Sequence, residues 1–73
     1  MDIEEFTWKI REQFDDESLV ITPETDFRDN DTFDSLVGMS ILVMIKDVFG
    51  YQMSVDTFLK CRTPKDLYNA VHR

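Results

Sequence analysis

The sequence has little of what usually stabilises or activates so small a chain. Its 73 residues include one cysteine, which cannot form an internal disulfide bond, and one histidine, His72. No cluster of cysteine and histidine residues indicates structural zinc. The stability of the fold must therefore come from packed helices, in what we expect to be one domain over residues 1–73. A core this small leaves no room for a deep catalytic cleft.

Long apolar runs are absent as well. No segment approaches the roughly 20 apolar residues that a membrane-spanning helix needs. The first five residues are Met-Asp-Ile-Glu-Glu, without the positive charge that begins a secretory signal peptide. We therefore expect no membrane insertion and a cytoplasmic location.

Basic residues are scarce, at 8 against 15 acidic residues, and the formal net charge is −7. The phosphates of a nucleic acid would be repelled by such a surface. We expect no nucleic-acid partner, and instead contacts with basic patches on other proteins.

The spacing of apolar residues predicts a first helix from Asp2 to about Asp15. Four apolar residues recur there at intervals of three or four, with charged residues between them: Ile3, Phe6, Ile10 and Phe14. Trp8 lies off this stripe, and packing over a neighbouring loop is favoured over partial exposure.

Residues 16–34 lack helical periodicity and contain Pro23 with many aspartate and threonine residues. This pattern predicts a long ordered loop, and loops of this length in small domains are usually functional. Five apolar residues are expected to anchor it to the core: Leu19, Val20, Ile21, Phe27 and Phe33.

The longest apolar segment predicts a second helix from Ser35 to Phe49, ended by Gly50 as a C-cap. One stripe is expected to face the core, formed by Gly38, Ile41, Leu42, Ile45 and Phe49. Six further residues of this helix are apolar: Leu36, Val37, Met39, Val43, Met44 and Val48. A surface helix does not need so many, so part of the second apolar face is expected to serve a partner.

Two more helices complete the expected all-α fold. Ser54 is suited to cap a short helix that carries Val55, Phe58 and Leu59. The segment Thr63-Pro64-Lys65-Asp66 combines a threonine cap, a proline at the first helical position and an acid three residues after the cap. The last helix would then present Leu67, Tyr68 and Val71.

Phe33-Asp34-Ser35-Leu36 stands where the loop becomes the second helix. A serine there has its hydroxyl near unsatisfied N–H groups and the positive end of the helix dipole, which would stabilise an attached phosphate. With the acidic charge, the long loop containing Phe27, the ending Phe49-Gly50 and the later Thr63-Pro64, the chain resembles the acyl carrier protein family over nearly its whole length. That resemblance implies a small four-helix bundle with a long loop between its first two helices and a short third helix.

The resemblance also implies a function. A phosphopantetheinyl transferase would esterify Ser35 with 4′-phosphopantetheine, Asp34 and Leu36 would complete the attachment motif, and the thiol of the arm would hold acyl groups as thioesters. The protein would be a non-catalytic carrier, expected to be monomeric. Its partners would be an acyl-loading ligase or acyltransferase and ketosynthase-type or other acyl-processing enzymes.

The second helix departs from the typical fatty-acid carrier, in which several positions are acidic. Here Asp47 is the one acidic residue between Ser35 and Phe49. We therefore expect docking to rely on apolar contact, with these residues in the docking surface: Leu36, Val37, Met39, Val43 and Asp47. This favours a specialised fatty-acid, polyketide or related biosynthetic pathway. Val37-Gly38 also looks similar to peptidyl carriers, so an aminoacyl or peptidyl cargo is the nearest alternative.

The sequence also bears on other interpretations. In an unmodified helical interaction module, Ser35 would be only an N-cap. A serine hydrolase is disfavoured because His72 is the penultimate residue. The acidic stretch from Asp26 to Asp34 does not match a calcium-binding EF-hand loop, so no metal site is expected. Cys61 is expected to be a small, partly buried apolar residue without a chemical role.

Overall fold

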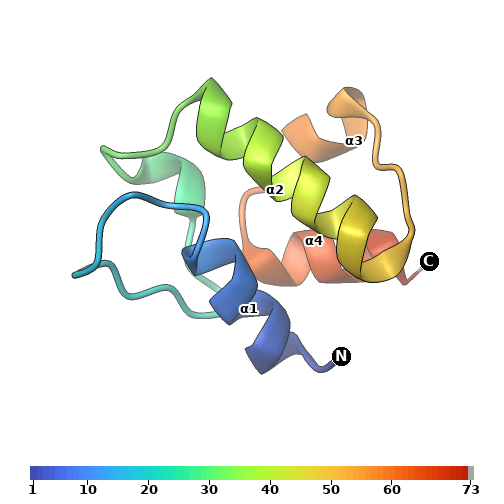
Figure 1. Cartoon of the computed structure of the whole chain (residues 1–73), viewed down its shortest axis with the longest axis horizontal. Helices are drawn as coiled ribbons and strands as arrows, with labels where there is room; N and C mark the ends of the chain where they lie inside the picture. Colours follow the sequence, from blue (N-terminus) through green and yellow to red (C-terminus); the bar gives the residue numbers. More distant parts are fainter. Residues whose placement is uncertain (73) are drawn as a thin grey trace.

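A computed structural model describes residues 1–72, in which the chain forms four α-helices, one short 3₁₀-helix and no strand. The elements are α1 (Ile3–Arg11), η1 (Phe27–Asp29), α2 (Ser35–Phe49), α3 (Val55–Leu59) and α4 (Pro64–Val71). In Figure 1, α2 crosses α4, α1 lies beside α4, and residues 12–34 loop around one side. The all-α four-helix fold with a long first loop and a short third helix is thereby confirmed.

Helix α1 packs through its predicted apolar stripe but is shorter than expected. Phe6 and Ile10 are fully buried, and Phe14 is buried just beyond the helix. The helix ends at Arg11 instead of about Asp15, which corrects the predicted boundary. The reason is a side chain: the Arg11 guanidinium donates to the carbonyl oxygens of Asp16 at 2.9 Å and Leu19 at 3.2 Å. These bonds turn the chain back before another helical turn can form.

Two apolar residues that were expected to pack are instead at the surface. Trp8 is 60% exposed, with the Arg11 guanidinium 5.6 Å from its ring centroid, and Val20 in the loop is 79% exposed. The predictions that Trp8 covers a neighbouring loop and that Val20 anchors the loop are therefore wrong. Because Leu19, Ile21 and Phe33 already pack against the core, Val20 is left on the outer side of the loop.

Helix α2 begins and ends where the sequence predicts, and Gly50 adopts the left-handed C-cap with φ 65°. Its buried residues are Val37, Gly38, Ile41, Met44 and Ile45. Leu42 and Phe49, which were expected in the core stripe, are only partly buried. The core face is thus rotated slightly from the predicted one, so that Val37 and Met44 lie inside it.

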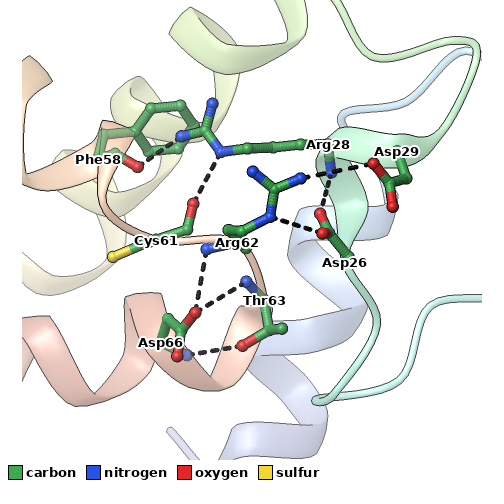
Figure 2. A network of polar contacts seen from close by, with 8 residues as sticks. All are labelled: Asp26, Arg28, Asp29, Phe58, Cys61, Arg62, Thr63 and Asp66. Carbon is green, nitrogen blue, oxygen red and sulfur yellow. Dashed lines mark hydrogen bonds and ion pairs between the residues drawn. The ribbon is translucent and has the colours of Figure 1, made fainter.

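Phe27 and Arg28 attach the loop before α2 to the segment between α3 and α4. Phe27 is 1% exposed, and its N–H donates to the carbonyl oxygen of Arg62 at 3.0 Å. The Arg28 guanidinium donates to the carbonyl oxygens of Phe58 at 2.5 Å and Cys61 at 2.8 Å, as Figure 2 shows. These contacts join residues about 30 positions apart in the sequence, at the corner between α3 and α4.

An ion pair lies beside this attachment. The Arg62 guanidinium donates to a carboxylate oxygen of Asp26 at 2.6 Å and also lies 3.4 Å from Asp29 (Figure 2). The hydrogen bond from Arg62 lowers the pKa of Asp26. Next to it, Thr63 and Asp66 form the predicted capping box at the start of α4. No helix within residues 1–72 has the length and apolar character needed to cross a bilayer.

The lowered pKa of Asp26 predicts how the stability of the fold depends on pH. A carboxyl group with a pKa depressed in the folded state adds stability above its unfolded pKa of about 3.9, and that stability is lost as the pH falls through the lower folded value. We expect Asp26→Asn to lower the free energy of unfolding at neutral pH and to converge on the wild type in acid. Urea unfolding between neutral pH and pH 2 measures this.

The control is Asp15→Asn, which removes an exposed carboxylate that makes no ion pair among residues 1–72. This variant should retain the wild-type acid dependence. An Asp26→Asn curve parallel to the wild type throughout the titration would show that the ion pair adds nothing to stability.

Candidate functional site

Ser35 is the first residue of α2 and is exposed. The residue before it, Asp34, is extended, with φ −148° and ψ −175°, and its carboxylate accepts the N–H of Val37 at 2.9 Å. Its carbonyl oxygen accepts the N–H of Gly38 at 3.0 Å, the first bond of the helix. Asp34 is therefore the N-cap.

This finding corrects the alternative in which Ser35 is only a helix cap. Among the described residues the Ser35 hydroxyl makes no hydrogen bond, because the carboxylate of Asp34 already occupies the capping position. The hydroxyl is thus both exposed and unengaged. Capping of α2 therefore does not explain why a serine occupies this position.

The start of α2 favours an anionic group on that hydroxyl. The N–H groups of Ser35 and Leu36 precede the first helical bond and have no acceptor within residues 1–72. Unpaired N–H groups and the positive end of the helix dipole both stabilise negative charge within the first turn. A phosphate ester on Ser35 would lie in this environment.

A groove of about 360 Å³ opens beside Ser35 between α2 and α3. On the α2 side it is lined by Gly38, Met39 and Leu42, and on the α3 side by Val55, Phe58 and Leu59. Phe33, Asp34 and Arg28 also line it. Its surface is almost entirely apolar, so it suits an apolar guest adjacent to the serine.

The α3 wall and Arg28 were missed by reasoning from sequence. Val55 and Leu59 are 61% and 60% exposed. The sequence held a signal for this wall, since a short helix with two apolar residues on its outer side has an unpartnered face. Arg28 gave no such signal, because its partners are backbone carbonyl oxygens.

The expected docking residues on α2 divide into two groups. Leu36, Met39 and Val43 are 72%, 63% and 58% exposed and follow one another at helical spacing, so they form one outward stripe. Asp47 is also exposed, one turn further along. Val37 is a correction: it is only 8% exposed, because it turns into the core, and it has little surface to offer a partner.

The other candidate groups have local structural partners. The His72 ring packs against Phe49 with centroids 5.5 Å apart, at the C-terminal end of α2. Because a helix of this length spans about 20 Å, His72 is too far from Ser35 to serve as its base. Cys61 is buried, with its thiol 3.4 Å from the carbonyl oxygen of Thr57.

The acidic loop is likewise engaged in local structure. Asp26 pairs with Arg62, and Asp34 caps α2. Within residues 1–72 no three histidine, cysteine, aspartate or glutamate side chains come together as a metal site would require. The loop carboxylates thus serve to fix the entry into α2.

Comparison with known proteins gives one result. The model of a family described as "Phosphopantetheine attachment site" matches residues 9–71, which includes Ser35 and all of α2, α3 and α4. Neither the curated proteins nor the solved structures contain a match to this chain.

The cap geometry yields a stability prediction. Asp34→Ala should lower the free energy of unfolding by about 1 kcal/mol, because the Val37 N–H loses its acceptor. Asp34→Ser should cost less, since serine also caps helices well. Ser35→Ala should stay within about 0.5 kcal/mol of the wild type. Urea unfolding monitored by circular dichroism measures all three, and a Ser35→Ala loss as large as that of Asp34→Ala would return the capping role to Ser35.

Proposed function

This chain belongs to the phosphopantetheine attachment-site family, whose members carry 4′-phosphopantetheine covalently on a serine, and we propose that Ser35 is that serine and that the protein is an acyl carrier. The observation that carries the proposal is the exposed, unengaged hydroxyl of Ser35 at the start of α2.

The other three serines of the chain support this choice by contrast. The Ser18 hydroxyl bonds to Asp16 at 2.7 Å, and the Ser54 hydroxyl caps α3 by accepting the Thr57 N–H. Ser40 lies within α2, away from the unpaired N–H groups at its start. Ser35 alone among them combines exposure, an unengaged hydroxyl and a helix N-terminus.

The attachment step is a phosphoryl-type substitution performed by a separate transferase. The Ser35 oxygen bonds to the phosphorus that carries the pantetheine arm of coenzyme A, and the bond from that phosphorus to the bridging pyrophosphate oxygen breaks. Adenosine 3′,5′-bisphosphate leaves, and a base of the transferase takes the serine proton. Ser35 supplies the nucleophile, while the unpaired N–H groups of α2 stabilise the charge of the phosphodiester product.

Carrying cargo needs no catalytic residue from this chain. When attached, the arm's thiol would take an acyl group as a thioester in exchange for the group that activated the acyl carbonyl, which leaves, and the tether would keep that thioester at a high effective concentration for any enzyme docked nearby. A loading ligase or acyltransferase and acyl-processing enzymes such as ketosynthases are the partners this chemistry requires.

The groove beside Ser35 favours an acyl cargo over an aminoacyl or peptidyl one. Apart from Arg28, Asp34 and Ser35, its lining comes from apolar side chains such as Met39, Leu42 and Leu59, which have nothing to offer an ammonium group or a peptide N–H along most of the groove. An aliphatic chain would instead be removed from water there. Together with the scarcity of acidic residues on α2, this supports a role in a specialised fatty-acid, polyketide or related pathway.

The first test is arm attachment. Incubation with coenzyme A and a broad-specificity phosphopantetheinyl transferase should add the mass of one phosphopantetheine to the wild type and to Ser40→Ala, and none to Ser35→Ala. Intact-protein mass spectrometry reads this directly. Ser40→Ala is the matched control because it removes the other α2 serine from an exposed position.

Failure of a folded wild type to gain this mass with several such transferases would end the carrier proposal. The remaining candidate would then be an unmodified interaction module that uses the exposed stripe of Leu36, Met39 and Val43. Sedimentation that depends on concentration would identify self-association through that stripe.

The second test concerns docking. Met39→Asp places a charge at the centre of the exposed α2 stripe and should lower kcat/KM for arm attachment by about tenfold, as truncation of a central interface residue commonly does. Ser40→Asp makes the same change of charge one residue further on and should stay close to the wild type. Equal rates for both variants and the wild type would contradict docking through this stripe.

A further inference from the structure

Helix α3 is too short to hold itself in place. It has five residues, and isolated helices below about 12 residues are marginal in water. Its N-terminal end is secured by Ser54, which caps it. Its outer residues Val55 and Leu59 are exposed, so packing through Phe58 is its main apolar attachment. The buried residues Met53 and Cys61 flank the helix, and hydrogen bonds at its C-terminal end add to this attachment.

Arg28 holds that end. Its Nε–H donates to the carbonyl oxygen of Cys61 and one terminal N–H donates to that of Phe58, at 2.8 and 2.5 Å (Figure 2). A cation beside the last carbonyl groups of a helix is also stabilised by the negative end of the helix dipole. The side chain thus serves as a C-terminal cap supplied from a distant loop.

The guanidinium is also enclosed by aromatic rings. It lies 4.7 Å from the ring centroid of Phe58 and 5.5 Å from that of Phe33. Aromatic faces stabilise a cation, so the charge of Arg28 is met by rings and carbonyl oxygens together. Although Arg28 lines the groove, the exposed lining is almost wholly apolar.

We refer to the contacts of Arg28 with Phe58 and Cys61 as the clamp, and Phe58 connects this clamp to α2. A Cβ atom placed on Gly38 would lie 3.4 Å from the Phe58 ring, so the absence of a side chain at Gly38 lets that ring approach the α2 backbone. Phe58 and Leu59 of α3 form the groove wall that faces Met39 and Leu42 of α2. Arg28 therefore contacts the same α3 residue whose ring meets the α2 backbone and forms part of the groove wall.

Resting on the proposed carrier function and its aliphatic cargo, we propose that Arg28 is a positioning residue that holds α3 opposite α2 and so sets the shape of the groove beside Ser35. A cargo with a free carboxylate is not favoured, because the cation in the lining already has carbonyl oxygens and rings as partners. A short acetyl group has little apolar area to bury in the groove.

Amide hydrogen exchange of the unmodified protein tests the clamp alone. Arg28→Met should raise exchange at residues 57–61 by about tenfold or more, because two bonds that hold α3 are lost, while α1 and α4 keep their protection. Arg62→Met is the matched control, since Arg62 pairs with Asp26 outside the groove. It breaks an ion pair of the same loop but leaves both bonds from Arg28 in place, so it should raise exchange in α3 much less than Arg28→Met does.

Thioester cleavage tests the cargo. The arm is loaded from octanoyl- or acetyl-coenzyme A, and loading is checked by mass. Hydroxylamine then attacks the thioester carbonyl carbon, forming a C–N bond and releasing the thiol. In the wild type and in Arg62→Met, the octanoyl ester should be cleaved about threefold or more slowly than the acetyl ester, because the groove excludes solvent from it. Arg28→Met should bring the two rates together.

Arg28→Lys keeps the charge but cannot span two carbonyl oxygens with parallel bonds, so it should fall between the wild type and Arg28→Met in both assays. It also keeps the test decisive if Arg28→Met does not fold.

Wild-type behaviour of both Arg28 variants would overturn the positioning role. Equal octanoyl and acetyl rates in a loaded wild type would overturn the cargo assignment while leaving the carrier function intact, whereas failure to acquire any arm would overturn the carrier function and the cargo assignment together.

Discussion

The attachment of the long loop to the corner between α3 and α4 is the constraint on which the functional end of this molecule depends. Phe27 is buried and bonded to Arg62, and Arg28 next to it donates to Phe58 and Cys61. Because the loop is fixed there, few residues remain before Asp34, and the direction in which α2 starts is set. The same contacts determine where Ser35 stands and where the opposite wall of the groove lies.

This arrangement separates stability from function within a very small core. Helix α1 packs mainly on α4, with Phe6, Ile10 and Leu67 fully buried. The N-terminal half of α2, by contrast, has only the loop and the five-residue α3 beside its groove face. Elements with few buried contacts open at low free-energy cost. A groove bounded by such an element can admit and release a guest without unfolding the rest.

The sequence was sufficient for features that depend on local chemistry and insufficient for those that depend on distant partners. Asp34-Ser35, Gly50 and Thr63-Pro64 marked helix ends correctly, because capping involves neighbours three or four residues away. Periodicity could not separate Val37 from Met39, since α2 is apolar on most sides and only packing decides which stripe faces inward. The end of α1 and the role of Arg28 depend on side chains that reach backbone carbonyl oxygens in other segments, which leave no mark in periodicity.

The distribution of charge bears on how a partner would approach Ser35. Residues 1–34 hold 12 of the 15 acidic residues and three of the eight basic ones, whereas residues 35–73 hold three acidic and five basic residues. Long-range attraction to a basic partner would therefore act on α1 and the loop, while the contact face of α2 offers the apolar stripe of Leu36, Met39 and Val43. Charge chiefly governs the rate of encounter, whereas buried apolar area chiefly governs the lifetime of a complex, so in partner binding the two surfaces would divide these tasks on either side of Ser35. A carrier that must visit several enzymes in turn gains from this division, because fast encounters and a small apolar contact allow both rapid arrival and rapid release.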